Sequence, residues 1–206
     1  MGKCPLCKTI SKPFLKSEFL ICQCCRGIFR KKKYLPLPEK ERARYQLHQN
    51  DIYDSGYRKF VSPLTTAILN YYKPTHKGLD FGSGPSSAAA AILNENGYTI
   101  SLFDPFFHNN PEILAQKFNY IICSEVMEHF HNPEKEFRLL KELLLPNGRL
   151  YCMTNIYSHD IDFDTWYYKN DFTHVFFYQK ETLEWIKENF GFTTLEISGN
   201  LILYKV

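Results

Sequence analysis

The stretch that decides the fold is LDFGSGPSS, residues 79–87. Gly82 and Gly84 stand two residues apart directly after a short apolar run. Glycine adopts backbone conformations that other residues avoid, and it lets the chain approach a ligand closely. Pro85 is well placed as the first residue of a helix. The stretch therefore predicts a strand, a tight ligand-binding turn and a helix in succession.

Strand and helix patterns alternate on both sides of this turn. Helices are expected before it at 39–48 and 57–72. From the turn onward, strands and helices are expected to alternate, with strands at 77–82, 98–104, 118–125 and 149–155 and helices at 85–97, 133–148 and 179–191. This alternation predicts a mostly parallel sheet with helices on both faces. Residues 192–206 are expected to form two short strands joined tightly at Gly199, and such a pair must be antiparallel.

Charge and cysteine content divide the chain of 206 residues. Residues 1–60 carry 14 Lys and Arg against 5 Asp and Glu, whereas residues 61–206 carry 11 against 17. We expect a head at 1–33, a linker and helix at 34–56, and an α/β domain at 57–206. No apolar run has the length of a membrane span or a signal peptide, which predicts a cytoplasmic protein without a membrane partner.

The head contains CPLC at 4–7 and CQCC at 22–25, separated by a segment that suits a hairpin. Four thiolates at this spacing, Cys4, Cys7, Cys22 and Cys25, predict a tetrahedral structural zinc site. Cys24 is an alternative fourth ligand or a spare thiol. Disulfides are the competing interpretation, and a cytoplasmic chain disfavours them. About 30 residues bury too little apolar surface to fold alone, so a bound Zn²⁺ would supply the missing stability.

A basic run, RKKK at 30–33, follows the second cysteine pair. Such a run can bind phosphate, which would make the head a contact surface for RNA. The alternative is that it is simply the solvated start of a linker.

The ligand of the glycine turn is constrained by its neighbours. In a doubly wound sheet the ligand lies beyond the carboxyl ends of the strands, where Asp104 ends the next strand and can accept the hydroxyls of a ribose. Asp80 precedes the turn, where it suits a cationic group and would face a pyrophosphate badly. Ser87 fits the third small position of a dinucleotide fingerprint only marginally, and the antiparallel finish is unlike the usual dinucleotide fold.

These motifs resemble the class I S-adenosylmethionine-dependent methyltransferases over about residues 76–206. The resemblance is carried by LDFGSGPSS, FDPFF and YIICSEVMEHFHNPEKEFRLLKELLLPNGRLYCMTN. The cysteine pairs, HQND and NDFTHVFFY are similar to a bacterial group of methyltransferases that bear a zinc ribbon. The resemblance implies an α/β fold: a Rossmann-like, doubly wound, mostly parallel sheet with an antiparallel C-terminal strand, and a small N-terminal zinc ribbon.

The resemblance also implies roles for single residues. Those expected to hold S-adenosylmethionine are Asp80, Gly82 and Gly84 at its methionine moiety, Asp104 at its ribose, and Ser124 and Glu125 near the transferred methyl. Two features depart from the family pattern. Ser86 stands where many members have a third glycine, and only 15 residues separate Asp104 from Tyr120. That is too short for a strand and a crossover helix, so the adenine is expected to be covered by Phe106, Phe107, His48 or Asn50.

Methyl transfer from a sulfonium is an in-line displacement, so the protein mainly aligns a nucleophile and removes its proton. The catalytic candidates are His129 and His174; the alternative for each is a purely structural imidazole. His174 lies in a segment with Trp166, Tyr167 and Asp171 that is expected to form a substrate lid. Glu125, Glu128 and His129 also resemble the metal cluster of some quinone-biosynthesis methyltransferases, although EVMEH is common without a metal.

The sequence therefore predicts a methyltransferase that uses S-adenosylmethionine. The negative net charge of residues 61–206 favours a small-molecule acceptor over RNA. The alternatives are an RNA methyltransferase that uses the basic head, an inactive cofactor-binding module, and a nucleotide-dependent oxidoreductase. The residue pattern indicates neither the acceptor atom nor an oligomeric state.

Overall fold

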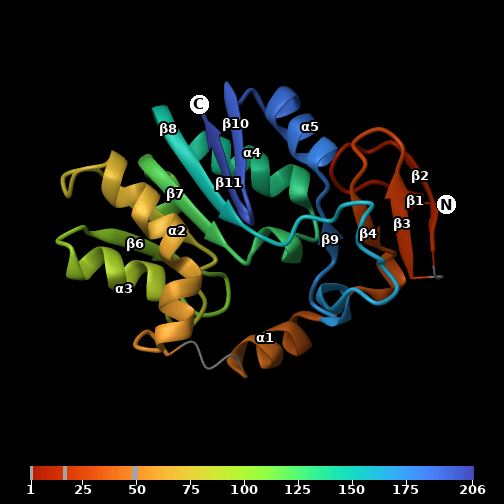
Figure 1. Ribbon diagram of the computed structural model, residues 1–206, viewed down its shortest axis with the longest axis horizontal. Helices are drawn as coiled ribbons and strands as arrows, with labels where there is room; N and C mark the ends of the chain where they lie inside the picture. The colour runs from red at the N-terminus through yellow and green to blue at the C-terminus, as the bar shows by residue number, and fades with distance from the viewer. Residues whose placement is uncertain (1, 16–17, 48–50) are drawn as a thin grey trace.

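Residues 2–15, 18–47 and 51–206 are described by the computed structural model (Figure 1). Its central sheet has six strands in the order β10-β11-β8-β7-β5-β6. The strands are β5 (Gly78–Phe81), β6 (Ile100–Phe103), β7 (Phe118–Ser124), β8 (Leu144–Met153), β10 (Thr194–Ser198) and β11 (Leu201–Lys205). β5, β6, β7 and β8 are parallel, and β11 runs antiparallel to both β8 and β10. The expected mostly parallel sheet with an antiparallel finish is confirmed.

Helices cover both faces of this sheet, as the alternation of patterns predicted (Figure 1). The helices α2 (Ser55–Tyr71) and α3 (Ala88–Glu95) pack with Tyr120 and Ile122 of β7. The helices α4 (Pro133–Leu143) and α5 (Lys180–Phe190) pack with Ile121 and Cys123 of the same strand. Because successive side chains of a strand point to opposite faces, one strand supplies both layers of the core.

The helix after the glycine turn begins later than its sequence suggests. α3 begins at Ala88, so the expectation that Pro85 opens it is wrong by three residues. Ser87 caps the helix instead: its Oγ accepts a hydrogen bond from Ala90 N at 3.0 Å and donates to Asp80 Oδ2 at 2.5 Å. A serine oxygen satisfies an otherwise unpaired N–H of the first turn, which fixes the start of the helix at the cap.

Two other boundaries of this region are informative. α4 ends at Leu143 and β8 begins at Leu144, so the helix is shorter than the expected range of 133–148. Residues 105–117, all of them described, contain the short 3₁₀ helix η2 (Pro111–Ala115) and an isolated bridge between Asp104 and His108. The absence of a strand and crossover helix in these residues agrees with the shortened fold predicted after Asp104.

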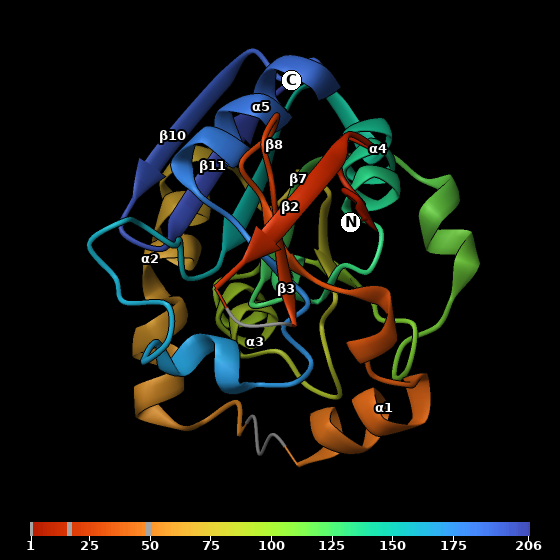
Figure 2. The ribbon, with the colours of Figure 1, turned by 90° about the vertical axis from the view of Figure 1, so that its right-hand side faces the viewer.

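The N-terminal segment forms a second sheet in the order β1-β2-β3-β4-β9 (Figure 2). Its strands are β1 (Gly2–Lys3), β2 (Ile10–Phe14), β3 (Phe19–Cys22), β4 (Ile28–Arg30) and β9 (Phe176–Phe177). The expected hairpin is the antiparallel pair β2–β3, which ends on Cys22. β9 comes from the C-terminal part of the chain, so the two regions share a sheet.

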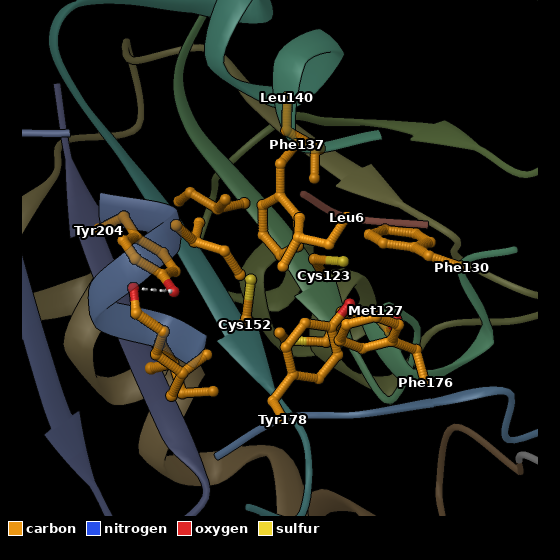
Figure 3. Packing of buried hydrophobic residues seen from close by; sticks show 14 of the residues in the cluster. Leu6, Cys123, Met127, Phe130, Phe137, Leu140, Cys152, Phe176, Tyr178 and Tyr204 are labelled. Atoms are coloured by element: carbon orange, nitrogen blue, oxygen red, sulfur yellow. Dashed lines mark hydrogen bonds between the residues drawn. The ribbon is translucent and has the colours of Figure 1, made fainter. Parts of the chain in front are cut away.

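The core runs without a break from the head into the α/β layers (Figure 3). Leu6 belongs to the same buried cluster as Phe130, Phe137 and Leu140. Phe137, Leu140 and Leu144 lie in this core, and Cys123 and Cys152 are fully buried in it. Between head and sheet the chain forms η1 (Lys32–Tyr34) and α1 (Pro38–Gln46). None of the helices in the described part of the chain is long and apolar enough to cross a membrane.

Candidate active site

A cleft of about 780 Å³ opens at the carboxyl ends of β5, β6 and β7. Its walls come from the glycine turn, from Asp104 and the residues after it, from residues 124–132 after β7, from α1, and from Asp171 and His174. The size and the aromatic and polar lining are those of a small-molecule site. The cleft lies where the doubly wound sheet predicts it.

The two glycines of the turn have different surroundings. Both have positive φ, +82° at Gly82 and +63° at Gly84, a conformation that L residues with a Cβ adopt at a cost. A Cβ on Gly82 would lie 2.6 Å from Val126 side-chain atoms, whereas the nearest atom to a Cβ on Gly84 is Ser86 O at 4.0 Å. Gly82 therefore permits the turn to pack on the protein, and Gly84 leaves open space in the cleft.

Asp104 is held rigidly at the cleft wall. Its Oδ2 accepts from Gly84 N at 3.0 Å, and its Oδ1 accepts from Phe106 N at 2.8 Å and Phe107 N at 3.1 Å. One carboxylate thus joins the glycine turn to the segment after β6. Phe106 and Phe107 line the cleft, as expected for residues that cover an adenine, whereas His48 and Asn50 lie outside the described residues.

Asp80 lies behind the lining of the cleft, and its expected contact with the methionine moiety stays a prediction. It is only 3% exposed, and the described lining of the cleft does not include it. Burial raises the pKa of Asp80 to about 6, while the Ser87 hydroxyl favours its ionised form. In this structure Asp80 accepts the hydrogen bond from Ser87 and so fixes the residue that caps α3.

Two buried carboxyl groups, those of Glu125 and Glu128, line the cleft and share the Tyr168 hydroxyl. The Tyr168 hydroxyl donates to Glu128 Oε1 at 2.6 Å and lies 3.3 Å from Glu125 Oε2. Burial and the neighbouring Glu128 raise the pKa of Glu125 to about 8, and burial also raises the pKa of Glu128. Glu125 has a φ of +52°, the kind of backbone strain that is found at functional sites. The Glu125 carboxyl therefore favours its neutral form at neutral pH, and the pKa of Glu128 is shifted in the same direction.

Ser124 and Glu125 also present polar atoms that their neighbours leave unsatisfied. Among the described residues, Ser124 Oγ and Glu125 Oε1 are buried without a hydrogen-bond partner. Both residues line the cleft. Such atoms are costly unless a ligand or water pairs with them.

The two predicted histidines meet at the opposite wall. Their rings are 4.9 Å apart in an edge-to-face arrangement. His129 Nδ1 lies 2.9 Å from Thr173 O, and His174 Nδ1 lies 2.7 Å from Tyr168 O. Because a carbonyl only accepts, each Nδ1 carries the proton and each Nε2 is the basic nitrogen of the neutral ring. Burial lowers the pKa of His174, which keeps that ring neutral.

Potential metal-ligating atoms converge here in a different set from the one expected. Ligand atoms of Glu128, His129 and His174 lie within 4.8 Å of one another. The sequence suggested Glu125 in place of His174, because the 44 residues between His129 and His174 hide their proximity.

Sequence reasoning missed the residues of α1. Tyr45 packs against His129 and Phe106, with ring centroids 5.2 and 5.8 Å away. Glu41 Oε1 lies 2.9 Å from His131 Nε2, and Arg44 binds Asp171. The available signal was the spacing of Glu41, Arg44 and Tyr45, which places them on one face of a helix.

The expected substrate lid is wrong for two of its members. Trp166 is buried among Tyr157, Phe163 and Phe177 at the junction with the head, and Tyr167 is 69% exposed. Aromatic packing on the head sheet draws Trp166 away from the cleft. Asp171 and His174 do line the cleft.

The head brings the four predicted thiols together. Cys4 Sγ lies 3.6 Å from Cys25 Sγ, and Cys7 Sγ lies 3.2 Å from Cys22 Sγ. All four sulfur atoms lie within 4.8 Å of one another, whereas Cys24 is exposed and is not in the group. Lys8 and Arg26, which follow the second cysteine of each pair, both have positive φ. The two knuckles therefore have the same local shape.

Comparisons with known proteins place this site in a family. The Methyltransferase domain family matches residues 53–197. The chain is 32% identical over 84 residues to the ubiquinone biosynthesis O-methyltransferase of Actinobacillus pleuropneumoniae serotype 5b, covering 39% of this chain and 36% of that protein. It is 30% identical over 86 residues to the protein of that name from Pasteurella multocida, covering 37% and 36%. The match thus spans about a third of the length of these curated relatives.

Solved structures share the fold. A SAM-dependent methyltransferase from Archaeoglobus fulgidus superposes with a TM-score of 0.56 at 16% identity, covering 72% of this chain and 94% of that one. Human N-acetylserotonin methyltransferase, solved in complex with SAM, gives a TM-score of 0.53 at 11% identity, covering 72% and 53%. Since the family match covers well over half of the chain and contains the glycine turn, Asp104 and both histidines, this protein belongs to the Methyltransferase domain family.

Proposed function

We propose that this protein transfers a methyl group from S-adenosylmethionine to a hydroxyl oxygen of a small organic acceptor. The observation that carries the proposal is that one cleft brings Gly84 and Asp104 together with His129 and His174. Gly84 and Asp104 suit the binding of the cofactor's amino acid and nucleoside parts. The two histidines suit the removal of a proton from an acceptor. Family membership supports the same activity.

The cleft fits S-adenosylmethionine by its own geometry. The open space at Gly84 and the unpaired Ser124 Oγ provide room and a polar partner for the methionine moiety. Asp104 would hold the ribose, and Phe106 and Phe107 would cover the adenine. When bound, this cofactor supplies an electrophilic methyl group on a positively charged sulfur.

His129 is the general base in this proposal. The carbonyl of Thr173 accepts a hydrogen bond from its Nδ1, so Nε2 is the nitrogen that would take the acceptor's hydroxyl proton as the C–O bond forms, the methyl–sulfur bond breaks and a neutral thioether leaves. His174 is more buried and keeps the His129 ring in place through their edge contact. A protonated His129 would have Nε2 3.9 Å from Glu128 Oε1, where it would favour ionisation of that carboxyl.

The acceptor class is supported by the relatives and by the lining of the cleft. The curated relatives are named as O-methyltransferases of ubiquinone biosynthesis. Tyr45, Tyr57 and Phe130 give the cleft aromatic surface against which a flat acceptor can pack. RNA receives less support, because the Arg30 side chain of the basic run is only 9% exposed and is bound to Glu18.

We also propose that the head, residues 1–33, holds a structural Zn²⁺ through Cys4, Cys7, Cys22 and Cys25. The convergence of their sulfur atoms supports a tetrahedral site, and four thiolates leave no position for chemistry. In this division residues 34–56 link the head to a methyltransferase domain at 57–206.

The test is calorimetric titration of the purified protein with S-adenosylmethionine and with S-adenosylhomocysteine. We expect micromolar binding that weakens at least tenfold in Asp104→Asn and is unchanged in Asp160→Asn, an exposed acid outside the cleft. Radiolabelled methyl transfer is then measured with a panel of phenols, catechols and other hydroxyl compounds, and His129→Gln should abolish it. Failure of the folded protein to bind either compound would overturn the proposal.

A further inference from the structure

We propose that Arg30 of the N-terminal head is a positioning residue of the active site: it holds the segment 169–175 so that Asp171 and His174 face the cleft. This inference rests on the proposed function of that cleft. It assigns the head a role in catalysis that does not require the head to touch a substrate.

The Arg30 guanidinium binds the backbone of this segment at several points. Nε donates to His174 O at 3.1 Å, and Nη2 donates to Lys169 O at 2.9 Å and to Asp171 O at 3.4 Å. Nη1 donates to Glu18 Oε2 at 2.8 Å, which orients the guanidinium from the head side. The Arg30 side chain therefore binds three carbonyl groups of the segment 169–175.

The backbone carries the same connection through Val175. Arg30 N donates to Val175 O at 2.9 Å, and Val175 N donates to Glu128 O at 2.9 Å. Val175 is thus hydrogen-bonded to Arg30 of the head on one side and to Glu128, the neighbour of His129, on the other. Since Thr173 O holds His129 Nδ1, the segment that Arg30 fixes also orients the proposed base.

Arginine is suited to this role by its shape. Its planar fork offers five N–H donors in fixed directions, whereas a lysine ammonium is a compact centre on a flexible stem. No single ammonium position matches the separate donor sites that Nε and Nη2 provide. Arg30→Lys should therefore keep the charge and lose most of the positioning.

Close packing at the junction limits other ways of holding the segment. A Cβ on Gly27, just before β4, would lie 2.3 Å from the Phe176 ring, so this ring packs directly on the glycine backbone. Gln179 Nε2 donates to Arg26 O at 2.5 Å just beyond β9. The head is therefore packed firmly against the segment that carries Asp171 and His174, although none of its described residues lines the cleft.

The experiment compares Arg30→Met and Arg30→Lys with the control Lys32→Met, an exposed member of the same basic run. Amide hydrogen exchange, which needs no acceptor, is followed by mass spectrometry. We expect at least tenfold faster exchange in residues 169–175 of Arg30→Met and no change in the glycine turn at 79–87. The affinity for S-adenosylmethionine should stay within about twofold in the control Lys32→Met. Unchanged exchange at 169–175, or equal acceleration throughout the molecule, would overturn the inference.

Turnover with an acceptor from the panel gives the second measurement. We expect kcat to fall 10- to 100-fold in Arg30→Met, nearly as far in Arg30→Lys, and not in Lys32→Met. A fall of kcat in Arg30→Met without faster exchange at 169–175 would show an effect that does not act through this segment and would overturn the inference. An inactive wild type that binds no cofactor would instead count against the proposed function itself.

Discussion

Asp171 Oδ2 accepts two hydrogen bonds from the Arg44 guanidinium, from Nε at 3.1 Å and from Nη2 at 2.8 Å. The other oxygen accepts from Thr173 N at 3.0 Å and from Thr173 Oγ1 at 2.6 Å. Burial opposes ionisation, but the Thr173 hydrogen bonds and Arg44 together hold the pKa of Asp171 below its usual range. The Arg44–Asp171 pair thus attaches α1, which carries Tyr45, to the segment that bears His174 at the cleft.

Breaking this pair should weaken cofactor binding more than it weakens the fold. Arg44→Met removes the charge and both hydrogen bonds, and an exposed or half-exposed ion pair stabilises a protein by only about 1 kcal/mol. We expect the dissociation constant for S-adenosylmethionine to rise about tenfold, which corresponds to about 1.4 kcal/mol, because α1 forms one wall of the site. Calorimetry measures this against Arg42→Met, an exposed arginine on the same helix. Equal affinities in the two variants would contradict the role of α1.

Alanine at the two glycines should separate binding from folding. Gly84→Ala places a methyl group in the open cleft and adds left-handed strain of about 1–2 kcal/mol. It should reduce cofactor affinity at least tenfold with a modest fall in Tm. Gly82→Ala adds the same strain and a clash with Val126, so its Tm should fall further. Thermal denaturation and calorimetry on both variants test this ordering, and a larger loss of Tm in Gly84→Ala would refute it.

Glu125 predicts a decline of stability with rising pH. Its pKa is raised by burial from 4.5 in the unfolded chain to about 8 in the fold. Below pH 4.5 both states hold the proton; between 4.5 and 8 only the folded state holds it, so the free energy of unfolding falls as pH rises, by at most about 1.4 kcal/mol per unit. Glu125→Gln should flatten this decline in urea denaturation between pH 5 and 8, whereas the exposed Glu196→Gln should not. A wild-type profile that rises through this window would exclude the neutral buried carboxyl.

Zinc content should distinguish two adjacent cysteines. The wild-type protein is expected to bind one equivalent of Zn²⁺, measured by inductively coupled plasma mass spectrometry after dialysis. Cys25→Ser should lose the metal and melt at a lower temperature, because metal binding supplies folding free energy to so small a head. Cys24→Ser should retain one equivalent, since Cys24 lies outside the cluster. The reverse result would assign the fourth ligand to Cys24.

The parts of the fold that short sequence intervals determine could be predicted. The glycine turn, Asp104 and the tight antiparallel pair at Gly199 each depend on residues within one supersecondary unit. The start of α3 was misjudged because the competition between Pro85 and Ser87 is settled by the hydrogen bond to Asp80, which lies on a preceding strand.

The contacts that join distant segments could not be predicted. Phe176 and Phe177 form a strand of only two residues, whose pairing with β4 leaves no periodic pattern. The same holds for Trp166, whose aromatic neighbours come from both the head and the body. Such contacts arise from packing between preformed surfaces rather than from local preference.

The pairing of Ile28 with Phe177 has a consequence for the order in which the protein matures. During translation the cysteine pairs leave the ribosome long before β9, the fifth strand of their sheet, is synthesised. Contacts of such long sequence separation form slowly, because the intervening chain must first be ordered. The N-terminal sheet and the segment bearing His174 therefore reach their final structure in one late step. A nascent chain that stops before β9 can complete neither of them.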